Sequence, residues 1–392
     1  MGQDVMQILP DDAQNAILVG RIWHPQLNGP CLVAVHENQI YDITSRQIPS
    51  MRDLLELDAP ERYVAAQLEQ AEKLISISAL IENSLAADTD PAQMHFLAPC
   101  DLQAVKACGV TFASSMIERV IEEQAAGDPA RAEAIRSRCL GIIGSRLSDL
   151  EAGSKAAQEV KDALIAEGMW SQYLEVGIGP DAEVFTKSQP LSAIGWGACA
   201  GLHPASSWNN PEPEIVLAVN SSGDIKGSTL GNDVNLRDIE GRSALLLGKA
   251  KDNNASCVIG PFIRLFDNNF DLDRVRNAEL RLHITGEDGF ELEGESLMRE
   301  ISRDPVDLVA QTINANHQYP DGFMLFLGTM FAPTKDRGVK GEGFTHKTGD
   351  VVSISSADIG MLQNQMKPSS DCRHWSFGIS AFMRNLSERG LV

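Results

Sequence analysis

The sequence predicts an α+β protein whose larger, C-terminal domain is a β-rich mixed sandwich or roll. Three observations support this fold class. Residues 171–392 contain short β-rich runs separated by Gly, Asn and Asp turns, and helical periodicity is scarce there. Residues 119–170 are strongly helical in pattern, which predicts a helical insertion into that domain. Residues 1–95 mix short strand-like and helix-like runs, as expected of a small α+β domain.

The N-terminal region, residues 1–95, is expected to support the fold rather than to carry chemistry. Residues 29–43 hold two apolar runs around a polar turn, which predicts a β-hairpin. Residues 51–57 and 61–81 have the periodicity of helices. In the second of these, the apolar residues form one stripe: Val64, Leu68, Ala71, Leu74 and Ile75. We place the domain boundary after residue 95.

The C-terminal domain, residues 96–392, begins with a strand and a turn that lead into a helix. Ser115 and Glu118 in this helix have the S-x-x-E spacing of a capping box. Apolar stripes at 135–150 and 160–165 then predict two helices within the insertion. Farther along, residues 218–230 contain the turn 220–224, which predicts a second hairpin.

The composition excludes several classes of function. The 392 residues include 33 basic and 54 acidic side chains, which gives a net charge of −21. Such a surplus opposes binding to nucleic acid and to anionic membranes. The sequence has no apolar run of about 18 residues and no N-terminal signal pattern. Its 7 cysteines form no C-x-x-C pair. We therefore expect a cytoplasmic protein without disulfides or a zinc site.

Two acidic motifs could bind a metal ion. Glu212 and Glu214 open a predicted strand, and side chains two residues apart on a strand share a face. Asp233 and Asp238 follow in a polar turn. Several carboxylates side by side repel one another unless a hard divalent cation lies between them. The alternative interpretation is a solvated strand edge followed by an Asx turn, and the motifs by themselves leave it open.

A pair of lysines precedes an apolar run and is a further candidate. Lys249 or Lys251 could be desolvated, with its pKa lowered toward neutrality, or could bind a substrate carboxylate. A surface lysine is the alternative. The sequence contains no G-x-S-x-G, G-x-x-x-x-G-K-[ST] or H-E-x-x-H motif, and no G-x-G-x-x-G follows a strand. Serine-hydrolase, P-loop, zincin and Rossmann functions therefore lack support.

Taken in order, these motifs resemble the fumarylacetoacetate hydrolase family over roughly residues 96–360. The resemblance rests on GVTFASSMIE (109–118), VFTKSQP (184–190), EPEIVLAV (212–219), GSTLGNDVNLRD (227–238), AKDNNASCVIGP (250–261), LGT (327–329) and GDVVSI (349–354). It implies a catalytic domain of the family's C-terminal fold and a homodimer or higher homo-oligomer. It also implies that Glu212, Glu214 and Asp233 bind Mg²⁺, or Mn²⁺ in its place.

The resemblance further implies roles for six other residues. Lys251 is the active-site lysine, with Lys249 as the alternative. Glu118 is the acid/base group on a helical lid formed by residues 119–170. Thr329 contacts the carboxylate end of the substrate. Lys187 and Arg237 also contact the substrate.

One departure from the family pattern points to the reaction. Hydrolases of the family carry His where this sequence has Ser115, so the dyad that activates water is incomplete. Dehydration needs no nucleophilic water, and long members of the family dehydrate 2-keto-3-deoxy-pentonates of the arabinonate or xylonate type. The resemblance therefore implies formation of 2-oxoglutarate semialdehyde in non-phosphorylative pentose catabolism. In this hypothesis Lys251 or Glu118 takes the C3 proton, Glu118 protonates the departing C4 hydroxyl, and Ser115 binds that hydroxyl.

Two alternatives remain open from the sequence. The first is a metal-dependent C–C hydrolase of acylpyruvates or other β-diketo acids. The second is a non-catalytic protein that binds 2-keto acids. The retained acidic and lysine motifs favour an enzyme over the second alternative.

Overall fold

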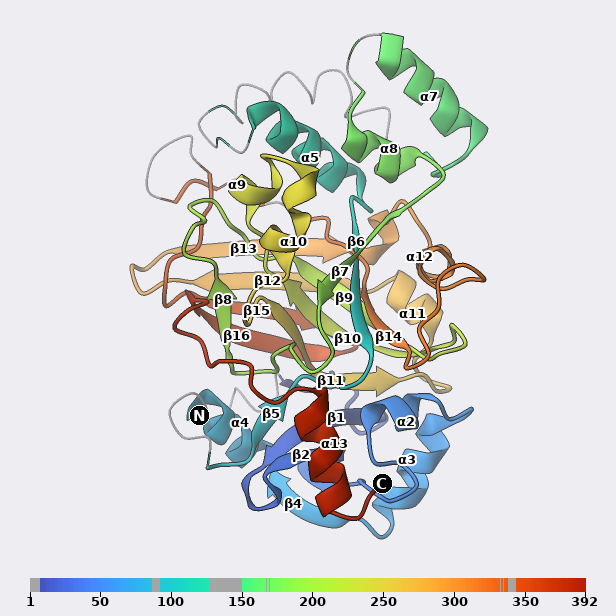
Figure 1. Ribbon diagram of the computed structural model, residues 1–392, viewed down its shortest axis with the longest axis vertical. Coiled ribbons are helices and arrows are strands. Elements are labelled where there is room, and N and C mark those ends of the chain that lie inside the picture. Colours follow the sequence, from blue (N-terminus) through green and yellow to red (C-terminus); the bar gives the residue numbers. More distant parts are fainter. Residues whose placement is uncertain are drawn as a thin grey trace.

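The computed structural model consists of two β-sheets with helices at both ends (Figure 1). It describes residues 8–86, 92–126, 150–166, 170–331 and 343–392, together with residues 128, 131, 168, 333 and 335–337. The helical insertion lies at one end of the molecule and the N-terminal strands and helices at the other (Figure 1). Among the described residues, no helix is long and apolar enough to cross a membrane.

The larger sheet has eleven strands and joins the N-terminal region to the rest of the chain. Its strands lie in the order β4 (Glu72–Ser76), β3 (Gln39–Asp42), β2 (Gly29–His36), β1 (Leu18–His24), β11 (Cys257–Leu265), β10 (Ile225–Asp233), β9 (Pro213–Val219), β14 (Phe323–Phe326), β6 (Ala104–Gly109) and β7 (Glu183–Ser188), with β5 (His95–Leu97) paired to β1. The β14–β6 pair is parallel and the other pairs are antiparallel.

The smaller sheet has five strands. They lie in the order β13 (Glu291–Leu297), β12 (Glu279–Thr285), β15 (Val351–Ser356), β16 (Gly360–Pro368) and β8 (Cys199–Leu202). Strand β12 alternates exposed and buried residues, because one face of this sheet meets solvent and the other meets the core.

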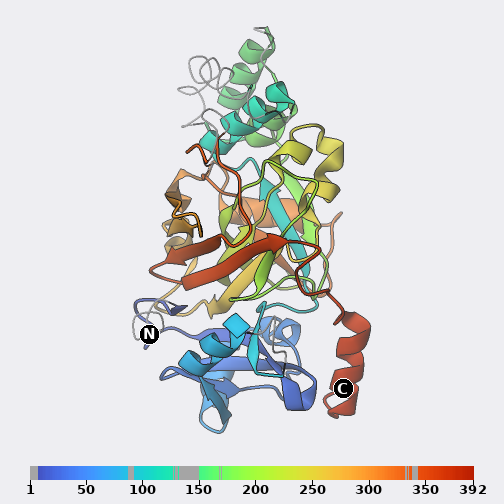
Figure 2. The same ribbon diagram turned by 90° about the vertical axis from the view of Figure 1, so that its left-hand side faces the viewer.

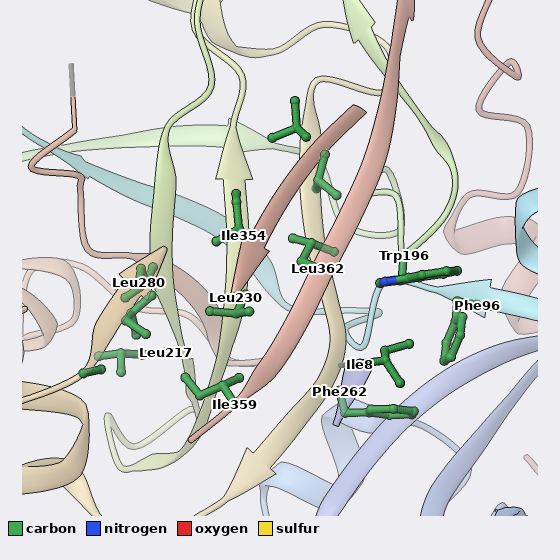
Figure 3. Packing of buried hydrophobic residues seen from close by; sticks show 14 of the residues in the cluster. Ile8, Phe96, Trp196, Leu217, Leu230, Phe262, Leu280, Ile354, Ile359 and Leu362 are labelled. Atoms are coloured by element: carbon green, nitrogen blue, oxygen red, sulfur yellow. The ribbon is translucent and has the colours of Figure 1, made fainter. Parts of the chain in front are cut away.

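The main core lies between the two sheets, as in a β-sandwich. Leu217 and Leu230 of the larger sheet share one buried cluster with Leu280, Ile354 and Leu362 of the smaller sheet (Figure 3). The opposite face of the larger sheet packs on helices α2 (Met51–Leu55) and α3 (Pro60–Leu68). Strand β9 is therefore buried on both faces, which explains its uninterrupted apolar run. The predicted β-rich sandwich is confirmed.

The other helices surround these sheets. They are α4 (Ile77–Ala86), α5 (Ala113–Ala125), α7 (Lys155–Ala166), α8 (Gln172–Ile178), α9 (Arg237–Glu240), α10 (Leu247–Lys251), α11 (Leu272–Arg276), α12 (Pro305–Thr312) and α13 (Ile379–Glu388), with 3₁₀ turns at Pro25–Leu27, Ala244–Leu246 and Met298–Glu300. Helix α13 lies alongside the N-terminal region (Figure 2). There Asn385 Nδ2 donates to the carbonyl oxygens of Leu27 and Asn28.

The structure corrects one element of the N-terminal region. The hairpins predicted at 29–43 and 218–230 are present as β2–β3 and β9–β10. The single helix expected at 61–81 is wrong, because α3 ends at Leu68 and the chain continues as β4 before α4. Ile75 in β4 pairs with Ile40 in β3, so its apolar side chain completes a sheet rather than a helical stripe.

The predicted boundary at residue 95 and the extent of the helical insertion stay predictions. Most of the stripe at 135–150 lies outside the described residues. The described part, α5, α7 and α8, has its own buried cluster, which includes Met116, Leu164 and Leu174. Trp208, from the loop before β9, is also buried in this cluster and so joins the insertion to the sheets.

Candidate active site

Three buried carboxylates meet where β9 and β10 pair. Strand β9 places Gly231 of β10 opposite Glu214, and the Asp233 N–H donates to the Glu212 carbonyl oxygen. Glu212, Glu214 and Asp233 are 7%, 2% and 1% exposed. One oxygen from each lies within 4.8 Å of the others. Asp238 points elsewhere, because it accepts hydrogen bonds from Ser206 Oγ and the Ser207 N–H.

Two buried lysines contact this triad. Lys251 ends α10, and its Nζ lies 2.7 Å from Glu212 Oε2 and 3.1 Å from Asp233 Oδ2. Lys187 Nζ lies 2.7 Å from Asp233 Oδ1 and donates to the carbonyl oxygens of Val234 and Lys251. Lys249 is exposed. The structure therefore brings Lys251 into the site and leaves Lys249 outside it.

Burial and the neighbouring charges together determine the directions of the pKa shifts in the triad. Burial raises the pKa of Glu214 well above its ordinary value, and the neighbouring Asp233 and Glu212 charges raise it further. Burial also raises the pKa of Glu212, although Lys251 and Arg119 oppose it. Burial raises the pKa of Asp233 less than Lys187 and Lys251 lower it, so the net shift is downward.

The pKa of Lys251 differs from the sequence-based expectation. Burial by itself would lower it, as we expected for a desolvated lysine. The carboxylates of Asp233 and Glu212 outweigh burial, so the pKa of Lys251 is raised. A lysine paired with two carboxylates holds its proton, and in this arrangement Lys251 is a cation rather than a base.

The loop after β14 closes one side of the triad. The Gly328 N–H donates to Glu214 Oε2 at 2.6 Å. Gly328 has a φ of +87°, and a Cβ there would lie 2.1 Å from Thr111 Oγ1, so this turn requires glycine. Thr329, the next residue, is 7% exposed and its Oγ1 accepts the Phe331 N–H. Thr329 is thus next to a residue that contacts the triad.

Helix α5 brings Glu118 to Arg237. Arg237 Nη2 lies 3.1 Å from Glu118 Oε2, and the guanidinium stacks 4.4 Å from the Trp208 ring centroid. The predicted capping box is wrong, because α5 begins at Ala113, before Ser115. Ser115 Oγ instead donates to the Phe112 carbonyl oxygen and accepts the Phe112 N–H. Glu118 is therefore not used as a cap and is paired with Arg237.

The sequence analysis missed an arginine that contacts the triad. Arg119 Nη2 lies 2.9 Å from Glu212 Oε1, and its Nη1 lies 2.8 Å from Glu240 Oε2. Asn235 Nδ2 also donates to Glu212 Oε1, at 3.1 Å. Arg119 follows Glu118 in the sequence, so α5 contributes two adjacent charged residues to the site.

Glu183 is a second residue that the sequence analysis missed. Burial and the charge of Glu240 raise its pKa to about 7, although the positive charges of Arg119 and Lys251 oppose this rise. A Cβ on Gly109 would lie 2.0 Å from Glu183 Oε2, so this glycine leaves room for the carboxyl group. The alternation of β7 could have revealed it, because Glu183, Phe185 and Lys187 share one face of that strand. Phe185 lies 5.5 Å from Lys251 Nζ.

The triad has the donor set that a hard divalent cation prefers. In the described part of the chain, no Lys or Arg side chain forms an ion pair with Glu214. Its carboxylate is nevertheless buried beside two others. A cation bound between the three would remove the repulsion that raises the pKa of Glu214. The residues therefore fit a magnesium-like ion.

Comparison with known proteins identifies the domain that holds this site. Residues 216–367 match the family model "Fumarylacetoacetate (FAA) hydrolase C-terminal". These residues are therefore similar to the C-terminal domain of that family, as the sequence motifs implied. The match contains the motifs at 227–238, 250–261, 327–329 and 349–354, whereas those at 109–118 and 184–190 precede it. The matched residues include Asp233 and Lys251, and the model begins two residues after Glu214.

Two curated relatives of this fumarylacetoacetate hydrolase-like chain are sugar-acid dehydratases. A 2-dehydro-3-deoxy-D-arabinonate dehydratase of Saccharolobus solfataricus is 30% identical over 185 residues, which is 47% of this chain and 58% of that protein. A probable 2-keto-3-deoxyxylonate dehydratase of Haloferax volcanii is 29% identical over 198 residues, 50% of this chain and 64% of that protein. Each match thus spans less than two thirds of the relative's own length.

Solved structures confirm the fold over most of the chain. A 2-keto-3-deoxy-D-arabinonate dehydratase complexed with magnesium and 2,5-dioxopentanoate covers 90% of this chain and 99% of its own, with a TM-score of 0.61 and 20% identity. The apo form of that dehydratase gives a TM-score of 0.60 with 19% identity. At these identities, the comparison establishes the shared fold of the two chains.

Proposed function

We propose that this protein is a hydro-lyase that uses Mg²⁺ to dehydrate a 2-keto-3-deoxy sugar acid. The substrate in this proposal is a 2-keto-3-deoxy-pentonate of the arabinonate or xylonate type, and the product is 2-oxoglutarate semialdehyde (2,5-dioxopentanoate). The observation that carries the proposal is the buried triad of Glu212, Glu214 and Asp233, next to Lys251. The names of both curated relatives support the substrate class. Its place in non-phosphorylative pentose catabolism and a homo-oligomeric assembly belong to the same proposal.

The residues around the triad have the charges that an anionic substrate requires. Mg²⁺, held by Glu212, Glu214 and Asp233, supplies polarisation of the 2-keto group and thereby makes the C3 protons acidic. Lys251 adds a positive charge beside the triad, where it favours the substrate carboxylate. Lys187 is engaged by Asp233 and two carbonyl oxygens, so we assign it the positioning of Asp233 rather than direct contact with substrate.

Two carboxyl groups can move the protons of the reaction. Glu118, the carboxyl group that α5 brings to Arg237, takes the C3 proton in this proposal. Glu183, whose burial favours its protonated form, then gives a proton to the C4 hydroxyl, which leaves as water. These steps leave a C3–C4 double bond, a protonated Glu118 and an ionised Glu183.

The same two groups can complete the reaction with their roles reversed. Glu183 takes a proton from C5, and Glu118 returns its proton to C3, which gives an enol with a C4–C5 double bond and returns both carboxyl groups to their starting states. The hydroxyl proton of this enol then moves to C4, and C5 becomes the aldehyde carbon. The sum is loss of one water and formation of the semialdehyde. Thr329 and Ser115 stay proposed contacts, to the substrate carboxylate and to the C4 hydroxyl.

The activity test uses purified protein, Mg²⁺ and 2-keto-3-deoxy-D-pentonate, with the L isomer in parallel. We expect Mg²⁺-dependent formation of semialdehyde, detected through its oxidation by an added NAD⁺-dependent aldehyde dehydrogenase. Acylpyruvates serve as the competing substrates. If an acylpyruvate is cleaved into two acids and neither pentonate is dehydrated, the C–C hydrolase replaces the hydro-lyase. The variant Glu118→Gln should lose the C3 proton abstraction, which is read as lost exchange of C3 hydrogen with deuterated water.

A further inference from the structure

A cavity lies away from the carboxylate triad. It has a volume of about 380 Å³ and is bordered by strands β1 and β5, the loop 191–199 and the segment 373–377 before α13. None of the triad residues, nor Lys251, lines it. This volume lies in the range of cavities that hold small molecules.

Aromatic rings form much of the cavity wall. Trp23 packs edge-to-face on Phe377 with a centroid distance of 5.3 Å, and stacks on His95 at 6.4 Å. Phe96 packs against Trp196 at 5.6 Å, and Figure 3 shows this pair (Figure 3). Because the rings are packed on one another, they are already ordered before any ligand binds. Such preformed flat apolar surfaces suit a planar ring.

The charge of the cavity is opposite to that of the whole protein. The chain has 54 acidic residues, yet no Asp or Glu is among the residues that line the cavity. The lining contains Arg21 and Arg373. Arg21 is neutralised, because it lies 3.6 Å from Asp101 and donates to the carbonyl oxygens of Ala98 and Cys100.

Arg373 supplies the uncompensated charge. Its side chain is exposed, and it forms no ion pair with any described residue of the chain. Its backbone is held in place, since Asn254 Nδ2 donates to the carbonyl oxygens of Ser369 and Arg373. The cavity thus combines an ordered aromatic wall with an exposed cationic side chain at its rim.

We propose that this aromatic cavity is a binding site for a small aromatic anion. The planar ring lies among Trp23, Phe96 and Phe377, and the anionic group, a carboxylate, sulfonate or phosphate, pairs with Arg373. A sugar acid lacks the flat apolar face that this wall offers, so the ligand is chemically distinct from the proposed substrate. The inference does not depend on the dehydratase activity.

The test uses the full chain and two dyes of similar shape. The anionic probe is 1-anilinonaphthalene-8-sulfonate, and the neutral probe is N-phenyl-1-naphthylamine. Titration by fluorescence should give one site per chain for the anion. Arg373→Ala should weaken its binding about tenfold, as expected for loss of a charge-assisted contact, and should leave the neutral probe unchanged. Ala193→Phe, which fills the cavity, should weaken both probes.

Controls separate this site from general dye binding. Arg62→Ala removes another exposed arginine, in α3, and should not alter the binding of either dye. Thermal unfolding should show that the variants fold like the parent protein. AMP and benzoate, titrated as competitors, distinguish phosphate from carboxylate as the preferred anion. Absence of anion binding to the native protein, equal binding in Arg373→Ala, or binding that Ala193→Phe leaves intact would each overturn the proposal.

Discussion

The variant Lys187→Met distinguishes two possible roles of Lys187, which either positions Asp233 or binds the substrate. The Lys187 side chain is fully buried, and its Nζ lies 2.7 Å from Asp233 Oδ1. It also donates to the carbonyl oxygens of Val234 at 3.2 Å and Lys251 at 2.9 Å. Methionine has a similar length but no donor. The substitution therefore leaves Asp233 with Lys251 as its remaining cationic partner and deprives two buried carbonyl groups of a hydrogen bond.

The expected loss is large because the pair is buried. Breaking a buried ion pair on one side costs about 3–5 kcal/mol. Lys251 still pairs with Asp233 in the variant, so we expect the free energy of unfolding to fall by about 3 kcal/mol. The pKa of Asp233 should also rise, because Lys187 is the largest influence that lowers it. A depressed carboxyl pKa stabilises the fold above its unfolded value, so the variant should lose less stability as the pH falls below about 4.

The assay is urea unfolding followed by tryptophan fluorescence, without added metal, at neutral pH and at about pH 3. Lys249→Met is the matched control, because Lys249 is exposed and should change stability by no more than about 0.5 kcal/mol. A loss below about 1 kcal/mol in Lys187→Met, together with a raised KM for the sugar acid and unchanged kcat, would refute the positioning role. Lys187 would then be a substrate ligand, as its sequence motif implies.

Three further predictions concern the triad and its surroundings. Glu214→Gln should raise the melting temperature of the metal-free protein and abolish the stabilisation by Mg²⁺, which is about 2.7 kcal/mol for the parent protein at a Mg²⁺ concentration one hundred times the Kd. Calorimetric Mg²⁺ binding equal to that of the parent protein would contradict this prediction. The pKa of Glu183 is raised from 4.5 to about 7, so the folded protein holds a proton that the unfolded protein releases, and the free energy of unfolding should fall by about 3 kcal/mol as the pH rises from 4.5 to 7. Glu183→Gln should flatten this part of the pH profile of stability, measured by urea unfolding, and an unchanged slope would refute the assignment. Gly328→Ala should destabilise the protein by about 2 kcal/mol or more and weaken Mg²⁺ binding, because the turn at Gly328 requires a positive φ. The control Gly248→Ala, where a Cβ meets no atom within 4 Å, should leave the thermal unfolding temperature unchanged.

The parts of the site that follow local rules could be predicted from the sequence. Strand alternation places Glu212 and Glu214 on one face, and the antiparallel β9–β10 pairing then brings Asp233 beside them. The family resemblance implies Lys251 with Lys249 as the alternative, and the structure buries Lys251 while Lys249 is exposed. The β-rich sandwich follows from short apolar runs and turn residues in the same way.

The missed residues depend on contacts between distant segments. Arg119 reaches Glu212 and Glu240 across 93 and 121 residues, so no local pattern relates them. The same holds for Trp208, which precedes β9 but is buried among the helices of the insertion. The expected helix at 61–81 failed for a related reason, because pairing with β3 decides the conformation of residues 72–76. In each case tertiary position outweighs the local pattern.

The continuity of the larger sheet limits how the protein can be divided. Strand β1 pairs with β11 at Ile263 and Arg264, so a shortened protein that starts at residue 96 would expose this end of one edge of β11. Such an unprotected edge recruits strands from other molecules and promotes aggregation. The shortened protein would also lose Asp12, which holds both terminal nitrogens of the fully buried Arg264 at 2.7 Å. In an evolutionary sense the N-terminal strands are therefore an obligatory part of the sheet that carries the candidate site. Recombination that exchanges them must preserve both the β1 edge and a partner for Arg264.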